Sequence, residues 1–121
     1  MNDLEILSPA RLSSRVQEFV SEASDLYVDF LSQGRKSLAT SLLSGLVVAV
    51  ATLDRVSQLP PGAERMGSLQ RAARVFHRLS LLIFVSAVYN DENDGSDLRT
   101  QHAYDTAADL SGLLGAAAKR R

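Results

Sequence analysis

The stretch 37–53 reads SLATSLLSGLVVAVATL and contains no charged residue. Its apolar residues fall on two adjacent stripes at helical spacing. The first stripe holds Leu38, Leu42, Gly45, Ala49 and Val56, the second holds Leu43, Leu46, Val50 and Leu53, and the remaining side holds Ser37, Ser41, Ser44, Val48 and Ala51. A helix without charge on any side is normally buried on all sides. We therefore expect the rest of the chain to cover this helix.

A strand and a membrane span are the alternatives for this stretch. Length favours a helix over a strand, because the pattern continues without a turn signal from Ser37 to Val56 and strands usually run about 5–6 residues. A membrane span needs about 20 apolar residues. The largely apolar core 42–53 is shorter and includes serine and glycine, so we expect no membrane contact.

The chain has 121 residues and no cysteine. This length predicts one domain, residues 1–121, that folds without disulfides or thiolate metal sites. Thirteen basic residues against fourteen acidic ones leave a net charge of −1, which argues against a dedicated nucleic-acid binder. The acidic N-terminal residues lack the basic and then apolar pattern of a secretion signal. The sequence therefore predicts a cytoplasmic protein.

Three further helical segments accompany the central one. Ser8-Pro9 is typical of a helix start, Gly34 of a helix end, and Pro60-Pro61-Gly62 is a clear break. A heptad-like seam runs along the first helix through Leu12, Val16, Phe19, Ala23, Leu26 and Phe30, and the third helix has a core seam of Leu69, Ala73, Phe76, Ile83 and Ala87. We predict an all-α, up-down-up-down four-helix bundle with helices at about 9–33, 36–57, 63–89 and 97–118.

The third helix is apolar on all sides from Leu81 to Val88, LLIFVSAV. A bundle gives each helix one buried side, so the two helices with surplus apolar surface indicate either deeper burial under residues 1–8 or a homo-oligomer interface. We favour the oligomer. Its predicted interface comprises Leu81, Val85, Val88, Ser44 and Val48. The leading hypothesis is a non-enzymatic, self-associating scaffold or adaptor without a cofactor.

Charge is unevenly distributed along the chain. Residues 55–78 contain five arginines and Glu64, a balance of +4, whereas residues 91–109 contain six acidic residues and Arg99, a balance of −5. Arg71, Arg74 and Arg78 form a line that contacts phosphates, pairs with acidic groups of a neighbouring protomer, or is simply a solvated face. A nucleic-acid accessory protein is therefore the alternative function. The acidic side of the first helix, which includes Glu18 and Glu22, is interpreted as a solvated face; a basic partner surface is the alternative.

Sites for metal or catalysis have little support in the sequence. The segment 90–101 has the glycine of an EF-hand loop but Asn90 and Gln101 at its first and twelfth positions, where Asp and Glu are required. Neither histidine follows a glutamate by three residues, as in di-metal bundles, so we predict no metal. Arg71 and His77 fit the loose Arg-x(4–6)-His pattern of the HEPN ribonucleases, in which His would act as acid or base and Arg would stabilise phosphate charge. This is the least favoured function.

The segment Leu69-Gln70-Arg71-Ala72-Ala73, followed by Leu79 and Leu82, resembles the third-helix pattern of a bacterial family of small four-helix bundles. That family includes proteins encoded in intervening sequences of large-subunit ribosomal RNA genes and the accessory variability protein of diversity-generating retroelements. The resemblance implies a cyclic homo-oligomer of five bundles. The family's Asn-Ile-Ala-Glu-Gly segment is replaced here by Leu46-Val47-Val48-Ala49-Val50, and the chain lacks the accessory protein's basic charge, so nucleic-acid binding is not carried over.

Overall fold

The computed structural model describes residues 9–89 and 97–119, and they form four helices with no strand among them. These are α2 (Pro9–Ser32), α3 (Lys36–Gln58), α4 (Ala63–Tyr89) and α5 (Asp97–Lys119). Over these residues the prediction of an all-α fold with four helices is confirmed, and each observed boundary lies within one residue of the predicted one. The EF-hand-like loop 90–96 and the lead 1–8 lie outside the described residues.

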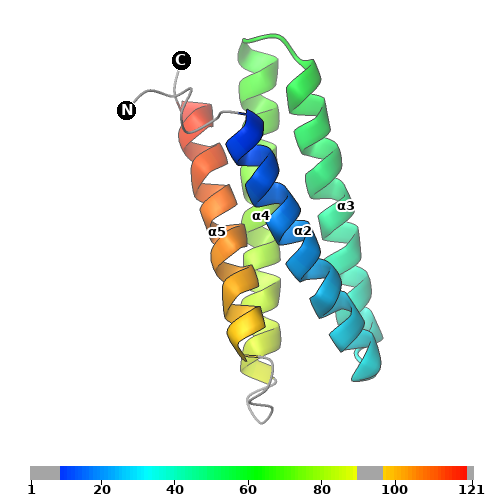
Figure 1. Cartoon of the computed structure of the whole chain (residues 1–121). Coiled ribbons are helices and arrows are strands. Elements are labelled where there is room, and N and C mark those ends of the chain that lie inside the picture. The colour runs from blue at the N-terminus through cyan, green and yellow to red at the C-terminus, as the bar shows by residue number, and fades with distance from the viewer. Residues whose placement is uncertain (1–8, 90–96, 120–121) are drawn as a thin grey trace.

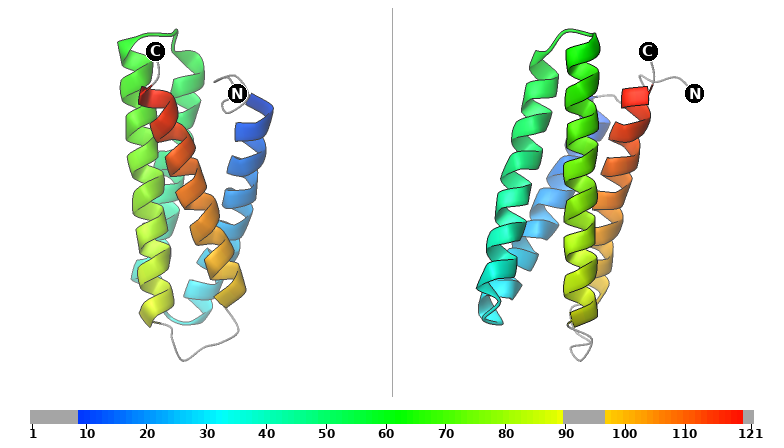
Figure 2. Two further views of the ribbon diagram at one scale, coloured as in Figure 1. Left: turned by 90° about the vertical axis from the view of Figure 1, so that its left-hand side faces the viewer. Right: turned by 180° about the vertical axis from the view of Figure 1, so that it is seen from behind.

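Consecutive helices run in opposite directions along one bundle axis (Figure 1). Each helix packs against the next one in the sequence, and α2 also packs against α5. The view from behind shows α4 in front, with α3 and α5 on either side of it and α2 behind (Figure 2). This arrangement is compatible with the predicted up-down-up-down topology.

The turn between α2 and α3 is closed by Gly34. Its φ of +75° lies in the left-handed region, which a glycine adopts without a steric penalty. The N–H of Gly34 donates to Leu31 O at 3.0 Å and the N–H of Arg35 donates to Phe30 O at 2.8 Å, the two bonds of a Schellman motif. The short turn makes α2 and α3 antiparallel neighbours.

Two phenylalanines meet in the centre of the core. Phe19 on α2 and Phe76 on α4 are fully buried, and their rings pack edge to face with centroids 5.6 Å apart. The predicted seam of α2 is confirmed at Phe19, Ala23, Leu26 and Phe30, all of which are buried. Small residues of α5, including Ala103 and Ala107, are also fully buried and allow α5 to approach its neighbours closely.

The expectation that the central helix is buried on all sides is wrong for the single chain. The buried residues of α3 lie on one side: Ala39, Leu42, Leu46, Ala49, Thr52 and Val56. The second predicted stripe is buried only in part: Leu46 is buried, whereas Leu43 and Val50 are exposed. With α2 and α4 as its neighbours, α3 has one side facing the core and leaves its other sides to solvent.

The core seam of α4 also differs from the prediction at its C-terminal end. Ala87 is exposed, and Ser80 and Ser86 are buried instead. Their hydroxyls donate to carbonyls of the same helix, Ser80 to His77 O at 2.6 Å and Ser86 to Ile83 O at 2.7 Å. A buried serine is tolerated when its hydroxyl is satisfied in this way, so residue polarity alone misplaced the seam.

Among the described residues, α3 is the one helix long and apolar enough to span a membrane by length and composition. Only 28% of its most apolar window is buried inside the bundle. The sequence argument that this segment is too short to span does not hold for the complete helix, Lys36–Gln58. What distinguishes α3 is therefore an uncharged surface that the single chain leaves uncovered.

Candidate functional site

A groove of about 270 Å³ runs between α3 and α4. Its walls are Ser41, Ser44, Gly45 and Val48 of α3 and Val75, Arg78, Leu79 and Leu82 of α4. A second cavity of about 460 Å³ shares Ser41 with it and is lined also by Val85, Ser86 and residues of the α2–α3 turn. The predicted interface residues Ser44, Val48 and Val85 therefore lie along adjoining depressions of the α3–α4 surface.

The large apolar side chains beside these depressions are exposed. Val48, Leu81 and Val85 are 49%, 46% and 48% exposed, and Ser44 is exposed as well; the side chain of Val88 is not among those described. Further exposed apolar side chains of the two helices are Leu43, Val47, Val50 and Phe84. Phe84 contacts Tyr104 of α5, and Leu43, Val47 and Val50 lie on a different side of α3 from Val48. We call Val48, Leu81 and Val85 the apolar face.

The arginine line lies on the exposed side of α4. Arg71, Arg74 and Arg78 are all exposed, and their spacing of three and four residues places them on one face of the helix. Within the described part of the chain, none of the three forms an ion pair. Arg78 also lines the groove, so the apolar depression carries a positive charge at one wall.

The residues of the ribonuclease pattern do not face the same direction. Arg71 and His77 are both exposed on α4, but six residues on a helix of 3.6 residues per turn place them about 120° apart around the axis. A phosphate held by one of these side chains is therefore poorly placed for the other. This spacing argues against the ribonuclease reading.

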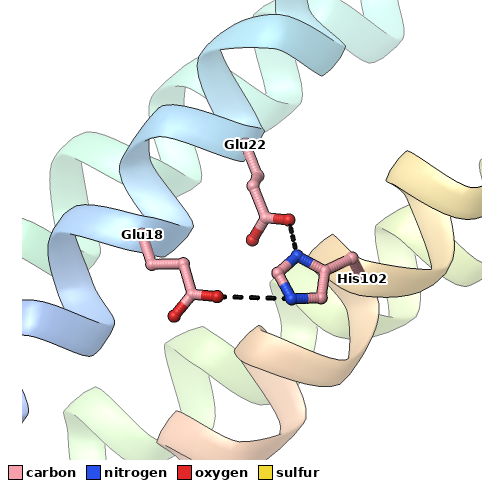
Figure 3. Close-up of side chains that lie close together, drawn as sticks. All are labelled: Glu18, Glu22 and His102. Carbon is pink, nitrogen blue, oxygen red and sulfur yellow. Dashed lines mark hydrogen bonds and ion pairs between the residues drawn. The ribbon is translucent and has the colours of Figure 1, made fainter.

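A polar cluster that the sequence did not indicate joins α2 to α5. Glu18 and Glu22 lie one turn apart on α2, and the imidazole of His102 on α5 points between them (Figure 3). The Nδ1–H of His102 donates to Glu22 Oε2, and Nε2 lies 3.3 Å from Glu18 Oε2. One ligand atom from each residue lies within 4.8 Å of the other two, so this cluster is where the described residues could hold a metal ion.

Neighbouring side chains hold the two carboxylates in place. The hydroxyl of Thr106 lies 3.2 Å from Glu22 Oε1 and 2.9 Å from the carbonyl oxygen of His102. Arg15 donates to Glu18 Oε1 at 3.3 Å and to Asp109 Oδ2 at 2.8 Å, the second bond crossing from α2 to α5. The side chain of Glu22 is only 15% exposed, against 36% for Glu18. Water therefore compensates less of the carboxylate charge of Glu22, and its hydrogen-bond partners matter more.

The two glutamates change the protonation of His102. The hydrogen bond to Glu22 and the charge of that carboxylate raise the pKa of His102 above its ordinary value, and the charges of Glu18 and Asp105 act in the same direction. Desolvation lowers the pKa and offsets part of this effect. An imidazolium with an N–H directed at each carboxylate is the arrangement these charges favour.

The interpretation of Glu18 and Glu22 as a solvated face is therefore wrong. They belong to the contact between α2 and α5, and their partner lies 80 positions further along the chain. The signal in the sequence is two pairs at a spacing of four, Glu18 with Glu22 and His102 with Thr106, on helices that the topology makes neighbours. The Glu-x-x-His pattern does not describe this cluster, because here the carboxylates and the imidazole come from different helices. The prediction of no metal, which depended on the absence of that pattern, is not tested by this geometry.

Comparison of the chain with protein-family models, with curated proteins and with solved structures finds no match. The resemblance of its third helix to the ribosomal intervening-sequence and retroelement accessory family therefore remains a prediction from the sequence.

Proposed function

We propose that this protein is a non-enzymatic scaffold or adaptor that acts as a homo-oligomer, built from up-down-up-down four-helix bundles that meet through the apolar face. The observation that supports this proposal is the exposure of Val48, Leu81 and Val85 in the folded single chain. Large apolar side chains left exposed beside a groove are typical of interaction sites. Burying it against another copy removes it from water.

A second copy fits this surface better than a charged partner does. The exposed sides of α3 between Ser37 and Leu53 carry no charge, so two such surfaces can meet without leaving an ionic group unpaired. Ser41, Ser44 and Gly45 keep the α3 wall of the groove low, which leaves room for an apolar side chain of a neighbour. Arg78 at the other wall then has the acidic groups of a neighbouring protomer as partners.

Insertion into a membrane is less consistent with the bundle. α3 shares its buried side with α2 and α4, and the exposed side of α4 carries Arg71, Arg74 and Arg78, charges that are costly inside a bilayer. A location in the cytoplasm accords with this view. The resemblance of the third helix to the bundle family favours a closed ring, and the family's five-membered ring is the state we propose.

Substitution at the groove tests the proposal. Val85→Asp and Val48→Asp each place a carboxylate in the proposed contact, and they should convert the oligomer to monomer without loss of helical circular dichroism. Val28→Asp is the matched control, because Val28 is exposed on α2 outside the apolar face. The proposed interface is contradicted if all three substitutions dissociate the oligomer equally, or if none of them dissociates it. Flotation of the wild-type protein with lipid vesicles would instead assign the apolar face to a membrane.

A second candidate is a nucleic-acid accessory protein. It is supported by the exposed line of Arg71, Arg74 and Arg78, which has no ion-pair partner within residues 14–87 and 100–119, where side chains are described. Phosphate groups are natural partners for such a line. Proteins that bind single-stranded nucleic acid usually also have exposed aromatic side chains that stack on bases. Between Arg71 and Arg78 the one phenylalanine, tyrosine or tryptophan is Phe76, which is buried. Any such binding would therefore be to the phosphate backbone.

A further inference from the structure

We propose that Glu18, Glu22 and His102 form a binding site for a divalent transition-metal ion of the Zn²⁺ class at the contact between α2 and α5. The site lies on different helices from the groove of the proposed interface, so either proposal can fail without the other.

The distance between the two outer ligand atoms suits a zinc ion. His102 Nε2 and Glu18 Oε2 are 3.3 Å apart. Two ligands bound tetrahedrally at the usual Zn–N and Zn–O distances of about 2.0–2.2 Å are separated by roughly 3.3–3.5 Å. An ion can therefore join these two atoms with little movement of either side chain.

The other ring nitrogen is already held in the way that metal-binding histidines require. Nδ1–H donates to Glu22 Oε2, and the hydroxyl of Thr106 lies 3.2 Å from the other oxygen of the same carboxylate. A histidine ligand usually donates its second N–H to a carboxylate, which fixes the ring and makes the free nitrogen a better donor. Glu22 thus orients the ring through Nδ1, and Nε2 and Glu18 are the groups that would hold the ion.

The chemistry of the donors determines the class of ion. A nitrogen donor together with carboxylate oxygens suits Zn²⁺ and other late first-row divalent ions, whereas Mg²⁺ and Ca²⁺ prefer oxygen donors alone. His102 is 55% exposed on its side chain, which gives an ion access from solvent. Water molecules complete the coordination at this open side.

The position of the site makes a bound ion a link between two helices. Glu18 and Glu22 come from α2 and His102 from α5, and these are the helices that close the bundle. An ion that binds the folded chain and not the unfolded one raises the melting temperature. Zinc binding should therefore be visible as stabilisation, without knowledge of any activity.

The test is titration of the full chain with Zn²⁺ at about pH 8, above the ordinary histidine pKa. Isothermal calorimetry should give one ion per chain, and thermal melts should rise with Zn²⁺. His102→Gln should weaken binding at least tenfold, and Glu22→Gln should weaken it by about 10–100-fold, as loss of an orienting carboxylate does. His77→Gln is the matched control, since it removes the other histidine from the exposed side of α4, and should leave binding unchanged.

Two results overturn the proposal. One is the absence of heat and of any shift in melting temperature on addition of Zn²⁺; the other is binding that His77→Gln weakens as much as His102→Gln does, which shows adventitious association with surface histidines. Circular dichroism of each variant without metal establishes that it is folded. Replacement by Co²⁺ provides a spectroscopic check, because visible absorption that depends on His102 requires nitrogen ligation at this site.

Discussion

A Cβ atom on Gly45 of α3 would stand 2.6 Å from Leu79 Cδ2 of α4. Leu79 is buried, so an added methyl group at Gly45 would force a packed side chain to shift. The two helices are therefore as close at this point as a glycine permits. The same close approach sets the depth of the groove that Gly45 and Leu79 line together with Val48 and Arg78.

Gly45→Ala should destabilise the protein even though alanine favours a helix by about 1 kcal/mol. The added methyl group overpacks the α3–α4 contact, which typically costs about 1–3 kcal/mol, so we expect a net loss of about 1 kcal/mol in the free energy of unfolding. Gly112→Ala is the control. Apart from its chain neighbours and the backbone of its own helix, no atom lies within 4 Å of a Cβ at that position, and we expect a gain of about 0.5–1 kcal/mol. Urea denaturation of both variants measures the difference, and equal effects would contradict the close approach.

Two phenylalanines of α4 should respond differently to truncation. Phe76→Ala removes a fully buried ring that packs against Phe19 and should cost about 3–5 kcal/mol of unfolding free energy. Phe84 is 53% exposed and contacts Tyr104 with ring centroids 6.1 Å apart, so Phe84→Ala should cost about 1 kcal/mol or less. Thermal or urea denaturation measures both losses. A loss for Phe84→Ala as large as that for Phe76→Ala would show that Phe84 belongs to the core of the single chain.

The stability of the bundle should fall as pH rises past the ordinary histidine range. The pKa of His102 is raised in the folded chain by Glu22, then by Glu18 and Asp105. The protonated imidazole therefore contributes stability that is fully present below about pH 6.5, its unfolded pKa, and is lost as pH passes the raised folded value. The side chain is more than half exposed, so solvent screens the effect.

Melting temperatures between about pH 6 and pH 9 measure this dependence. The wild-type protein should lose stability across that range relative to His102→Gln, and His77→Gln should follow the wild type. If the difference in melting temperature between wild type and His102→Gln is the same at every pH, the ionic contact of His102 does not cause that difference. The experiment is done without divalent ions, because Zn²⁺ at the proposed site would compete with the proton.

Binding to nucleic acid distinguishes the two candidate functions. For a scaffold we expect no association with RNA or duplex DNA at roughly 50 mM salt, where phosphate contacts are strong. Binding that is abolished in the Arg71→Ala/Arg74→Ala double variant and retained in Arg55→Ala, an exposed arginine of α3, would favour the accessory protein. Fluorescence anisotropy over a range of salt concentrations provides the measurement.

Local patterns in the sequence predict most of the fold. The seam through Phe19, Ala23, Leu26 and Phe30 and the glycine at position 34 locate α2 and its end because spacing and capping depend on near neighbours in the chain. Hydrophobic periodicity misplaced the buried side of α4 at its C-terminal end, because residue polarity does not indicate burial there. Ser86 is buried and Ala87 is exposed, since a serine hydroxyl that donates within its own helix behaves as a small core residue.

The sites could be predicted only in part, for a related reason. Exposure of Val48, Leu81 and Val85 follows from counting how much apolar surface one bundle can bury, and the sequence suffices for that count. The cluster of Glu18, Glu22 and His102 depends on which helix pairs with which, and on the rotation of each helix about its axis. Neither quantity is encoded in a short motif, so the acidic side of α2 was assigned to solvent.

The molar mass of the wild-type protein in solution tests the central claim most directly. Light scattering coupled to size-exclusion chromatography at micromolar concentration should give a multiple of the 13.1 kDa chain mass, with five chains as the proposed state. The apolar face of α3 and α4 then has its partner. A mass of one chain at every concentration, with Val48, Leu81 and Val85 left facing water, would contradict the account.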